Sequence, residues 1–469
     1  MSTTDPDLPP SWLAVTLGQV VNYGATEKAE PEEITPETWV LELEDVERNS
    51  SRVLQRVSFS ERRSKSTKNR FSRGEVLYGK LRPYLNKVVY ADAPGVCTTE
   101  IVPIKPGPAL AGRYLFHWLR HPEFLRYVTD VSHGVNMPRL GTEAGLKAPF
   151  VLAPLREQQR IADKLDTVLA RVDACRDRLA RVAPLLKRFR QSVLAAATSG
   201  RLTGDWRTDR HLDAAPDAVA GTPFSALPMA RLLSTNRTPL KTGPFGTLLS
   251  KSEHVSHGID VVGIENIDRG KFLAGSKVQI TPEKAVELSA YDLLPGDVII
   301  SRSGTVGEVC VVPPGMGELR FSTNIIRVVL NEEIIRADYF VFLFLGCTEV
   351  LNQVDDLCKG STRAFLNQTI LNGISYPTPS LEEQTEIVRR IDTLFAFADR
   401  LEARLAQAQT AVDRLTPSLL AKAFRGELVP PDPADEPATE LLKRLAHSRQ
   451  AEAPKPRRRR AVATSALNP

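Results

Sequence analysis

Hydrophobic residues recur at alternating spacings of four and three positions along two long stretches of the chain, and the positions between them are mostly charged or polar. Such a seam keeps one face of a slightly under-wound helix against a partner, so the pattern predicts two coiled-coil helices. The seam positions are Ile161, Leu165, Val168, Val172 and Leu179 in the first stretch, and Ile387, Ile391, Leu394, Leu401 and Leu405 in the second.

The two stretches are copies of each other. Leu155–Leu202 aligns without a gap on Leu381–Leu428, at an offset of 226 residues, and about 18 of the 48 aligned positions are identical. A match of this length indicates an internal duplication. Gly200 and Gly426 lie at equivalent C-terminal ends, where glycine commonly terminates a helix. Equivalent helices in one chain can pair with each other, so we predict an antiparallel coiled coil within the chain rather than a zipper between two chains.

Local sequence also marks the start and the interruptions of these helices. The second copy opens with a capping box, Ser380-x-x-Glu383, which satisfies free backbone amides at a helix start. Proline lacks the amide hydrogen that a helix interior needs. We therefore expect a kink or a break near Pro184 and near Pro417.

The regions before each helix carry short β-branched runs separated by glycine and proline, which is typical of mixed domains with short strands. The predicted fold class is α+β: two mixed α/β domains separated by two long helices, with a pseudo-twofold internal duplication. The two domains resemble each other little in sequence. Strands are expected in Gly74–Tyr90 (two strands around a basic turn), Ile101–Gly107, Pro295–Gly315 (two strands around a glycine turn) and Ile325–Leu330, and helices in Ala111–Arg126 and Arg336–Leu351.

The predicted boundaries follow from these patterns. They are a first domain over 1–152, a helix over 153–200, a linker over 201–222, a second domain over 223–379, a helix over 380–426, and an unstructured proline-rich and basic tail over 427–469.

Charge and cysteine usage restrict the class of protein. The net charge is +5 and the isoelectric point about 8.9, which permits DNA binding without requiring it. Five cysteines are scattered without a Cys-x-x-Cys pair, as in reduced cytosolic proteins. Neither a secretion signal nor an apolar run of membrane-spanning length is evident. We expect a cytoplasmic protein with no membrane partner.

No recognisable catalytic or cofactor motif is present. The sequence contains neither a Gly-x-Gly-x-x-Gly loop nor a phosphate-binding loop ending in Gly-Lys-Ser/Thr. His254 and His257 form a lone His-x-x-His in a loop, which does not indicate a metal site. We therefore predict a chain with no catalytic residue, no cofactor and no metal of its own.

Basic residues gather in both domains, interleaved with serine, threonine and asparagine. Such mixtures suit contacts to DNA phosphates and base edges, although composition alone favours a solvated surface over a DNA contact. The candidate DNA-binding residues are Arg62, Arg63, Lys65, Lys68, Arg70, Lys80, Arg82 and Lys87 in the first domain, and Arg302, Ser303, Thr305, Asn324, Arg327, Lys359 and Arg363 in the second.

Several local sequences resemble those of the specificity subunits of type I restriction-modification systems. The duplicated helix opening, a proline and hydrophobic run into Glu-Gln, is the most specific of them. The similar segments are Leu17–Val21, Gly74–Lys87, Gly95–Pro106, Pro295–Val312, Phe321–Leu330 and the two helix openings at Pro154 and Pro379.

The resemblance implies a DNA-binding subunit with two target-recognition domains that read a bipartite site on double-stranded DNA. It also implies two methyltransferase subunits and ATP-dependent restriction subunits as partners, with S-adenosylmethionine, ATP and Mg²⁺ bound in those partners. The alternatives are a coiled-coil scaffold with two ligand-binding heads and no DNA target, or a DNA-binding regulator that works alone.

Two arginines in turns have different expected roles. Arg82 lies among other basic residues, which favours a phosphate contact, whereas Arg302 lies at a tight glycine turn, which favours contact with a guanine edge. Pairing of either arginine with a carboxylate of its own domain is the alternative.

Overall fold

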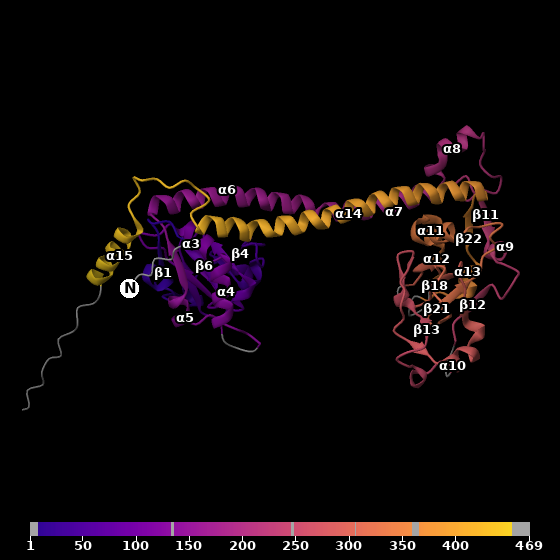
Figure 1. The fold of residues 1–469 in the computed structure, drawn as a ribbon, viewed down its shortest axis with the longest axis horizontal. Coiled ribbons are helices and arrows are strands. Elements are labelled where there is room, and N and C mark those ends of the chain that lie inside the picture. The colour runs from indigo at the N-terminus through magenta and orange to yellow at the C-terminus, as the bar shows by residue number, and fades with distance from the viewer. Residues whose placement is uncertain (1–7, 133–135, 245–247, 305, 359–364, 453–469) are drawn as a thin grey trace, which may run out of the picture. The chain divides into compact units, whose positions relative to one another are not determined.

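The computed structural model describes residues 8–132, 136–244, 248–304, 306–358 and 365–452. The chain forms two compact units, the first comprising Met1–Arg178 with Ala408–Pro469 and the second Leu179–Gln407. Both boundaries fall inside long helices (Figure 1). Each unit is therefore a mixed domain packed on its own section of helix.

The first unit contains a five-stranded sheet in the order β2-β5-β8-β3-β4 and a three-stranded sheet in the order β7-β6-β9. β1 pairs antiparallel with β10, which ties the start of the domain to its end. Its strands are β1 (Leu13–Thr16), β2 (Glu27–Ala29), β3 (Trp39–Leu41), β4 (Val57–Ser58), β5 (Lys68–Phe71), β6 (Val76–Gly79), β7 (Val88–Tyr90), β8 (Gly95–Cys97), β9 (Ile101–Ile104) and β10 (Pro149–Leu152). The short helices are α1 (Leu17–Val20), α2 (Phe59–Arg62), α3 (Gly112–Trp118), α4 (Pro122–Val131) and α5 (Thr142–Lys147).

The second unit contains two four-stranded sheets, in the orders β12-β21-β18-β19 and β16-β13-β20-β17, and two strand pairs, β11-β22 and β14-β15. Its strands are β11 (Ser225–Pro228), β12 (Leu240–Thr242), β13 (Ile259–Val262), β14 (Ile267–Asp268), β15 (Lys271–Phe272), β16 (Gln279–Ile280), β17 (Asp292–Leu293), β18 (Val298–Ser301), β19 (Val309–Val311), β20 (Leu319–Phe321), β21 (Ile325–Val328) and β22 (Ser375–Thr378). The short helices are α8 (Gly204–Asp209), α9 (Met229–Leu232), α10 (Pro282–Glu287), α11 (Ala337–Gly346), α12 (Thr348–Cys358) and α13 (Gln368–Asn372).

The two domains share one backbone framework. β6 pairs antiparallel with β9 along Val76–Gly79, and β18 pairs with β21 along Val298–Ser301 in the same register. The preceding glycines, Gly74 and Gly296, both have φ of 90°. Each domain also has one parallel pair at the corresponding place, β3 with β8 and β13 with β20. The two domains, which resemble each other little in sequence, therefore share a backbone framework whose equivalent strands carry different side chains.

The predicted strands are confirmed, as β6 and β7, β9, β18 and β19, and β21. Each of the two predicted short helices is divided into two, α3 with α4 and α11 with α12. In the first domain the reason is local: Pro122 opens α4, and the imidazole Nδ1 of His121 accepts the Glu123 amide at 3.3 Å.

Three long helices carry the duplicated sequence: α6 (Leu155–Ala180), α7 (Val182–Thr198) and α14 (Leu381–Phe424). The break between α6 and α7 lies near Pro184, as predicted, whereas α14 continues through Pro417 without a break. Pro417 and Asp413 are both exposed, so water can satisfy the carbonyl that loses its helical partner. None of the helices within the described residues is long and apolar enough to cross a membrane.

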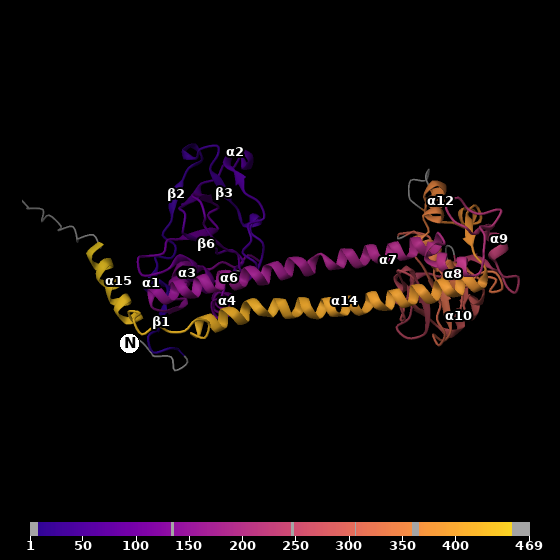
Figure 2. The same ribbon diagram turned by 90° about the horizontal axis from the view of Figure 1, so that it is seen from above.

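Within each unit the helices pair antiparallel, as the matched seams predict (Figure 2). In the first unit Arg176 of α6 donates to Asp413 of α14 at 3.4 Å, and in the second unit Arg190 of α7 bonds to Asp399 and Glu402. Among the predicted seam residues, Ile161, Leu165, Val172, Ile387, Ile391 and Leu405 are buried, and Val168, Leu179, Leu394 and Leu401 are half-buried.

A buried glutamine fixes each domain to the start of its long helix. Gln158 accepts the Ala111 amide at 2.9 Å and donates to the carbonyls of Ala109 and Ala153 at 3.3 and 2.8 Å. Gln384 repeats these contacts, accepting the Arg336 amide at 2.7 Å and donating to the carbonyls of Ile334 and Pro379 at 2.9 Å. The duplicated Gln is therefore a structural anchor, because in each unit it joins the helix start to the segment that leads into α3 or α11.

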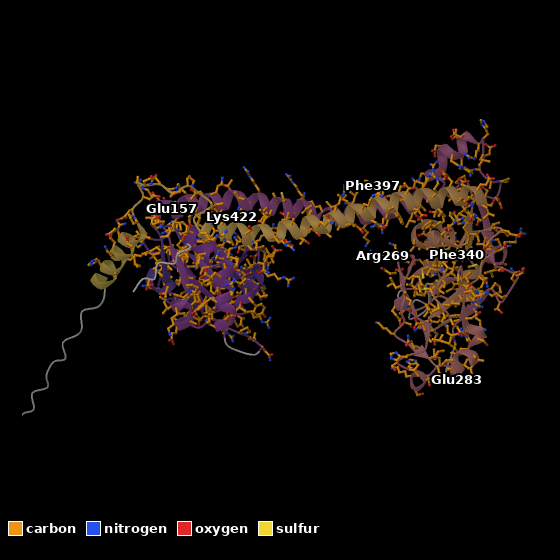
Figure 3. All side chains as sticks on the ribbon, viewed as in Figure 1. Glu157, Arg269, Glu283, Phe340, Phe397 and Lys422 are labelled. Atoms are coloured by element: carbon orange, nitrogen blue, oxygen red, sulfur yellow. The ribbon has the colours of Figure 1, made fainter. Side chains whose placement is uncertain are left out.

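The neighbouring glutamates are buried too, with partners that differ. Glu157, labelled at the start of α6 in Figure 3, accepts the Trp12 indole N–H at 2.9 Å, and burial raises the pKa of its carboxyl. The Glu383 carboxylate accepts hydrogen bonds from the Thr203 hydroxyl and the Arg207 guanidinium, each at 2.7 Å. The predicted capping box is thus half formed, because only the bond from the Glu383 amide to the Ser380 hydroxyl, at 3.3 Å, is present.

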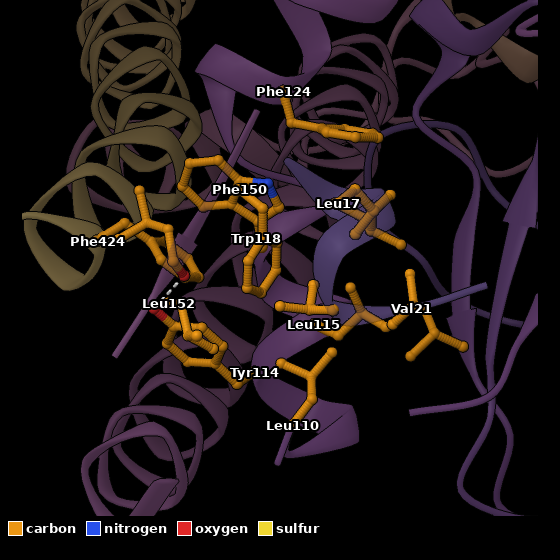
Figure 4. Packing of buried hydrophobic residues seen from close by; sticks show 14 of the residues in the cluster. Leu17, Val21, Leu110, Tyr114, Leu115, Trp118, Phe124, Phe150, Leu152 and Phe424 are labelled. Carbon is orange, nitrogen blue, oxygen red and sulfur yellow. Dashed lines mark hydrogen bonds between the residues drawn. The ribbon is translucent and has the colours of Figure 1, made fainter. Parts of the chain in front are cut away.

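An aromatic cluster closes the core of the first unit (Figure 4). Phe424, the last residue of α14, packs against Tyr114 and Trp118, with ring centroids 4.9 Å away in both cases. The Tyr114 hydroxyl donates to the Val151 carbonyl at 2.9 Å. The end of α14 is thereby part of the first domain's core.

The segments predicted as linker and as unstructured tail each contain a helix within the described residues. Residues 201–222 include α8, and Arg390 of α14 holds Asp205 at 2.6 Å. Beyond α14, helix α15 (Ala438–Glu452) buries Leu441 and Leu445 in the first unit's core. The expected unstructured tail is therefore wrong up to Glu452, because apolar residues spaced four apart give α15 a face to bury. The basic residues from Lys455 to Arg460 lie outside the described residues.

We predict that Gln158→Ala destabilises the first unit by about 2–4 kcal/mol, because it leaves one buried amide and two buried carbonyls without their partner. Hydrogen exchange of peptides from β1 and α3, measured on the full chain, would report the loss. The exposed neighbour provides the matched control, since Gln159→Ala should leave exchange unchanged. Equal protection in the two variants would contradict the anchoring role.

Candidate nucleic-acid interface

The loop after β6 presents basic and aromatic side chains on a constrained backbone. Arg82 and Asn86 both adopt the left-handed region, with φ of 49° and 48°. Arg82 is exposed and donates its backbone amide to the Pro138 carbonyl at 2.7 Å. Tyr84 between them is 47% exposed. Non-glycine residues at positive φ persist only where surrounding contacts hold them, and such strain is concentrated at functional sites.

Three backbone segments meet beside this loop in the first domain. The Lys80 amide donates to the Glu100 carbonyl, and the Leu140 amide donates to the Lys80 carbonyl, both at 3.0 Å. Next to Leu140, the Arg139 Nε donates to the Glu100 carboxylate at 3.0 Å. We call Glu100, Lys80 and Arg139 with Leu140 the first row.

The second domain repeats this arrangement with other side chains. The Arg302 amide donates to the Asn324 carbonyl, and the Leu366 amide donates to the Arg302 carbonyl, again both at 3.0 Å. The residue before Leu366 is Phe365, which is 37% exposed. We call Asn324, Arg302 and Phe365 with Leu366 the second row.

Side chains of the second row hold one another in place. The Ser303 hydroxyl donates to the Asn324 Oδ1 at 2.8 Å. The Arg302 guanidinium lies 4.0 Å from the centre of the Phe365 ring. Arg302 is only 6% exposed, and burial lowers the pKa of its guanidinium. The exposed groups at this edge are therefore Asn324 and Phe365, supported from beneath by Arg302.

Comparison with known proteins identifies the relatives of this chain. Residues 246–409 match the family model described as the type I restriction modification DNA specificity domain. The specificity subunit of the type I restriction enzyme EcoBI from Escherichia coli is 32% identical over 332 residues, which cover 69% of this chain and 67% of that protein.

The chain belongs to the family of type I restriction enzyme specificity subunits. The StySPI specificity subunit of Salmonella potsdam is 28% identical over 71% of this chain and 69% of that protein. Among solved structures, a chain from work on complex assembly and conformational transition of the type I R-M system superposes with a TM-score of 0.68 at 19% identity, covering 90% of this chain and 99% of that one. The HsdS subunit from Thermoanaerobacter tengcongensis superposes with a TM-score of 0.54 at 19% identity, covering 90% and 98%.

Half of the candidate basic residues of the first domain are engaged inside this specificity subunit. Lys68 is 3% exposed and donates to Glu42 at 2.8 Å. Arg62 and Arg70 pair with acidic residues of the same domain, and Lys87 donates to the Leu43 carbonyl at 2.6 Å. Because these positions serve internal contacts, we leave them out of the proposed interface.

The other basic candidates of the first domain reach the surface. They are Arg63, Lys65, Lys80 and Arg82, none of which has a side-chain ion pair with any described residue. Lys80 is half-buried and the other three are exposed.

Candidates in the second domain divide similarly. Arg327 is 2% exposed and donates to the Asp292 carboxylate at 2.6 Å, and burial lowers the pKa of its guanidinium. It is a core residue, so we also leave it out. Thr305, Lys359 and Arg363 lie outside the described residues.

Tyr84, Glu100, Arg139 and Phe365 were not predicted from the sequence. An isolated exposed aromatic or an acidic residue carries no pattern of its own. The internal duplication contained the signal, because the 226-residue offset that matches the helices also matches Leu140 with Leu366, and Arg139 with Phe365.

We predict that Lys68→Ala lowers the stability of the first domain by about 2–3 kcal/mol, because it leaves the Glu42 carboxylate without its cation in a largely buried place. Lys65→Ala, a change of the same type at an exposed position, should lower it by less than about 0.5 kcal/mol. Hydrogen exchange of β3 and β5 at neutral pH would measure the loss of stability in both variants. Equal protection in the two variants would show that Lys68 is not an internal cation.

Proposed function

We propose that this specificity subunit binds double-stranded DNA with both domains, and that each domain reads one half of a bipartite target. The subunit would dock two methyltransferase subunits and ATP-dependent restriction subunits onto that target. It contributes no catalytic residue itself, and S-adenosylmethionine, ATP and Mg²⁺ bind in the partners.

The observation that carries the proposal is the pair of equivalent rows. The same backbone hydrogen bonds, at the same 3.0 Å lengths, hold Lys80 and Arg302 between their neighbours. The side chains on the two rows nevertheless differ, with Glu100 and Arg139 in the first and Asn324 and Phe365 in the second. A shared backbone arrangement that presents different polar and aromatic side chains suits two domains that recognise different base sequences, since base edges are distinguished by their donor and acceptor patterns.

The basic residues around the first row suit the other half of DNA recognition. Lys80 and Arg82 precede Tyr84 on one loop, and Arg63 and Lys65 are exposed in the same domain. Contacts to phosphates supply affinity and orientation, and contacts to base edges supply specificity. Family membership favours this assignment over a scaffold whose two domains bind something other than DNA.

The partner assignment rests on the relatives. The EcoBI and StySPI proteins are specificity subunits of type I restriction enzymes, and the better-matching solved chain comes from work on assembly of the type I R-M system. A chain in which we find no catalytic motif fits a division of labour, in which separate subunits carry methyl transfer and DNA cleavage.

Exchanging the second domain tests whether the two readers are independent. Residues 225–378, from β11 to β22, would be replaced by the corresponding segment of another family member. Because β11 and β22, the first and last strands of the segment, pair with each other, the exchange leaves the long helices α7 and α14 intact. Sequencing of methylated DNA, with the methyltransferase subunits present, should show one altered half-site and one unaltered. Alteration of both halves would contradict independent reading.

Arg82 should contact a phosphate. Arg82→Gln should weaken binding to cognate and mismatched duplexes alike, and reduce the slope of log affinity against log salt by about one. Arg82→Lys keeps the charge and the same positive φ demand, so it controls for backbone strain and should retain the slope. A loss confined to one base position would instead assign Arg82 to base reading.

A further inference from the structure

We propose, on the basis of the proposed DNA-reading function, that the two rows read different base pairs. The exposed Arg139 side chain, which we call the first tip, reads a G·C pair. The exposed Asn324 and Phe365 side chains, which we call the second tip, read an A·T pair.

Equivalent backbone geometry makes the two tips comparable. In each row a central residue bonds through its amide to one neighbour and through its carbonyl to the other. Backbone segments joined by such hydrogen bonds lie about 4.8 Å apart, so the outer positions of a row are separated by about 10 Å. That separation fits within a major groove about 12 Å wide. One row can therefore contact both bases of a single pair.

The second tip is preorganised as an amide beside an apolar ring. The Ser303 hydroxyl donates to one lone pair of the Asn324 Oδ1, which fixes the orientation of this exposed amide and leaves the second lone pair and the amide N–H groups for a base. Phe365 keeps over a third of its surface exposed while the buried Arg302 guanidinium holds its ring. An asparagine amide pairs with adenine N6 and N7, and an apolar side chain contacts the thymine methyl group. These two groups are the major-groove signature of an A·T pair.

The first tip is a supported guanidinium. Glu100 binds the Nε of Arg139, with its carboxylate oxygens at 3.0 and 3.3 Å. The two terminal nitrogens of Arg139 have no hydrogen bond to any described residue, and 46% of the side chain is exposed. A guanidinium with both terminal nitrogens available matches guanine O6 and N7 in a bidentate contact. Glu100 is a positioning residue here, because it sets the direction of the fork.

The test transfers the chemistry of the first tip to the second. The full chain with Asn324→Glu and Phe365→Arg would be assembled with the methyltransferase subunits and used to select duplexes randomised in both half-sites. We expect one position of the second half-site to change from A·T to G·C, with at least a tenfold preference, and the first half-site to stay unchanged. Thr369→Arg adds the same positive charge as Phe365→Arg at a nearby exposed position and should change no preference.

Removal of single methyl groups provides a readout that does not depend on the double variant. Replacing one thymine of the half-site by uracil should weaken wild-type binding about threefold to fivefold at one position, the effect of one lost buried methyl group. In Phe365→Ala the same replacement should have no effect, while non-specific binding at low salt is retained because the phosphate contacts remain.

The outcomes separate the two proposals. A wild-type complex that selects no bipartite sequence contradicts the proposed function itself. A wild-type complex that selects a bipartite target, with unchanged preference in the double variant and no methyl effect that depends on Phe365, overturns only the assignment of base pairs to the tips.

Discussion

The buried Glu-Gln pair at the start of each long helix is the constraint on which both domains depend. A side-chain amide that satisfies one backbone N–H and two carbonyls in the interior cannot be replaced by an apolar group without leaving those groups unsatisfied. Gln158 and Gln384 therefore fix where α3 and α11 begin relative to α6 and α14. Next to each anchor, the strand directly before the long helix (β10 or β22) pairs with the first strand of its domain (β1 or β11), which joins both ends of the domain to the helix start.

On this anchored framework, the backbone and the side chains have separate tasks. The backbone hydrogen bonds around Lys80 and Arg302 are the same in both domains and create the same two outer positions. The side chains at those positions are free to differ, because they face away from the core. A duplicated fold can in this way hold two different recognition surfaces without changing the packing that supports them.

Charge in this protein serves both stability and surface chemistry. Lys68 and Arg327 are nearly inaccessible and neutralise carboxylates of their own domains, whereas Lys65 and Arg82 are exposed. Burying a charge costs free energy unless an opposite charge compensates it. The buried cations must therefore stay paired with their carboxylates. The exposed ones have no such constraint and remain available to DNA phosphates.

The sequence by itself determined the duplication, the coiled-coil seams, the glycine stops and the β6–β7 and β18–β19 hairpins, because each depends on residues close together in the chain or on a repeat. It did not reveal the kinship of the two domains, since matched backbones carry dissimilar side chains. Nor did it separate Lys68 from Lys65, or bring Glu100 beside Arg139 and Phe365 beside Arg302. Only the tertiary structure decided these, because burial and pairing depend on which distant segments meet, and local pattern contains no information about that.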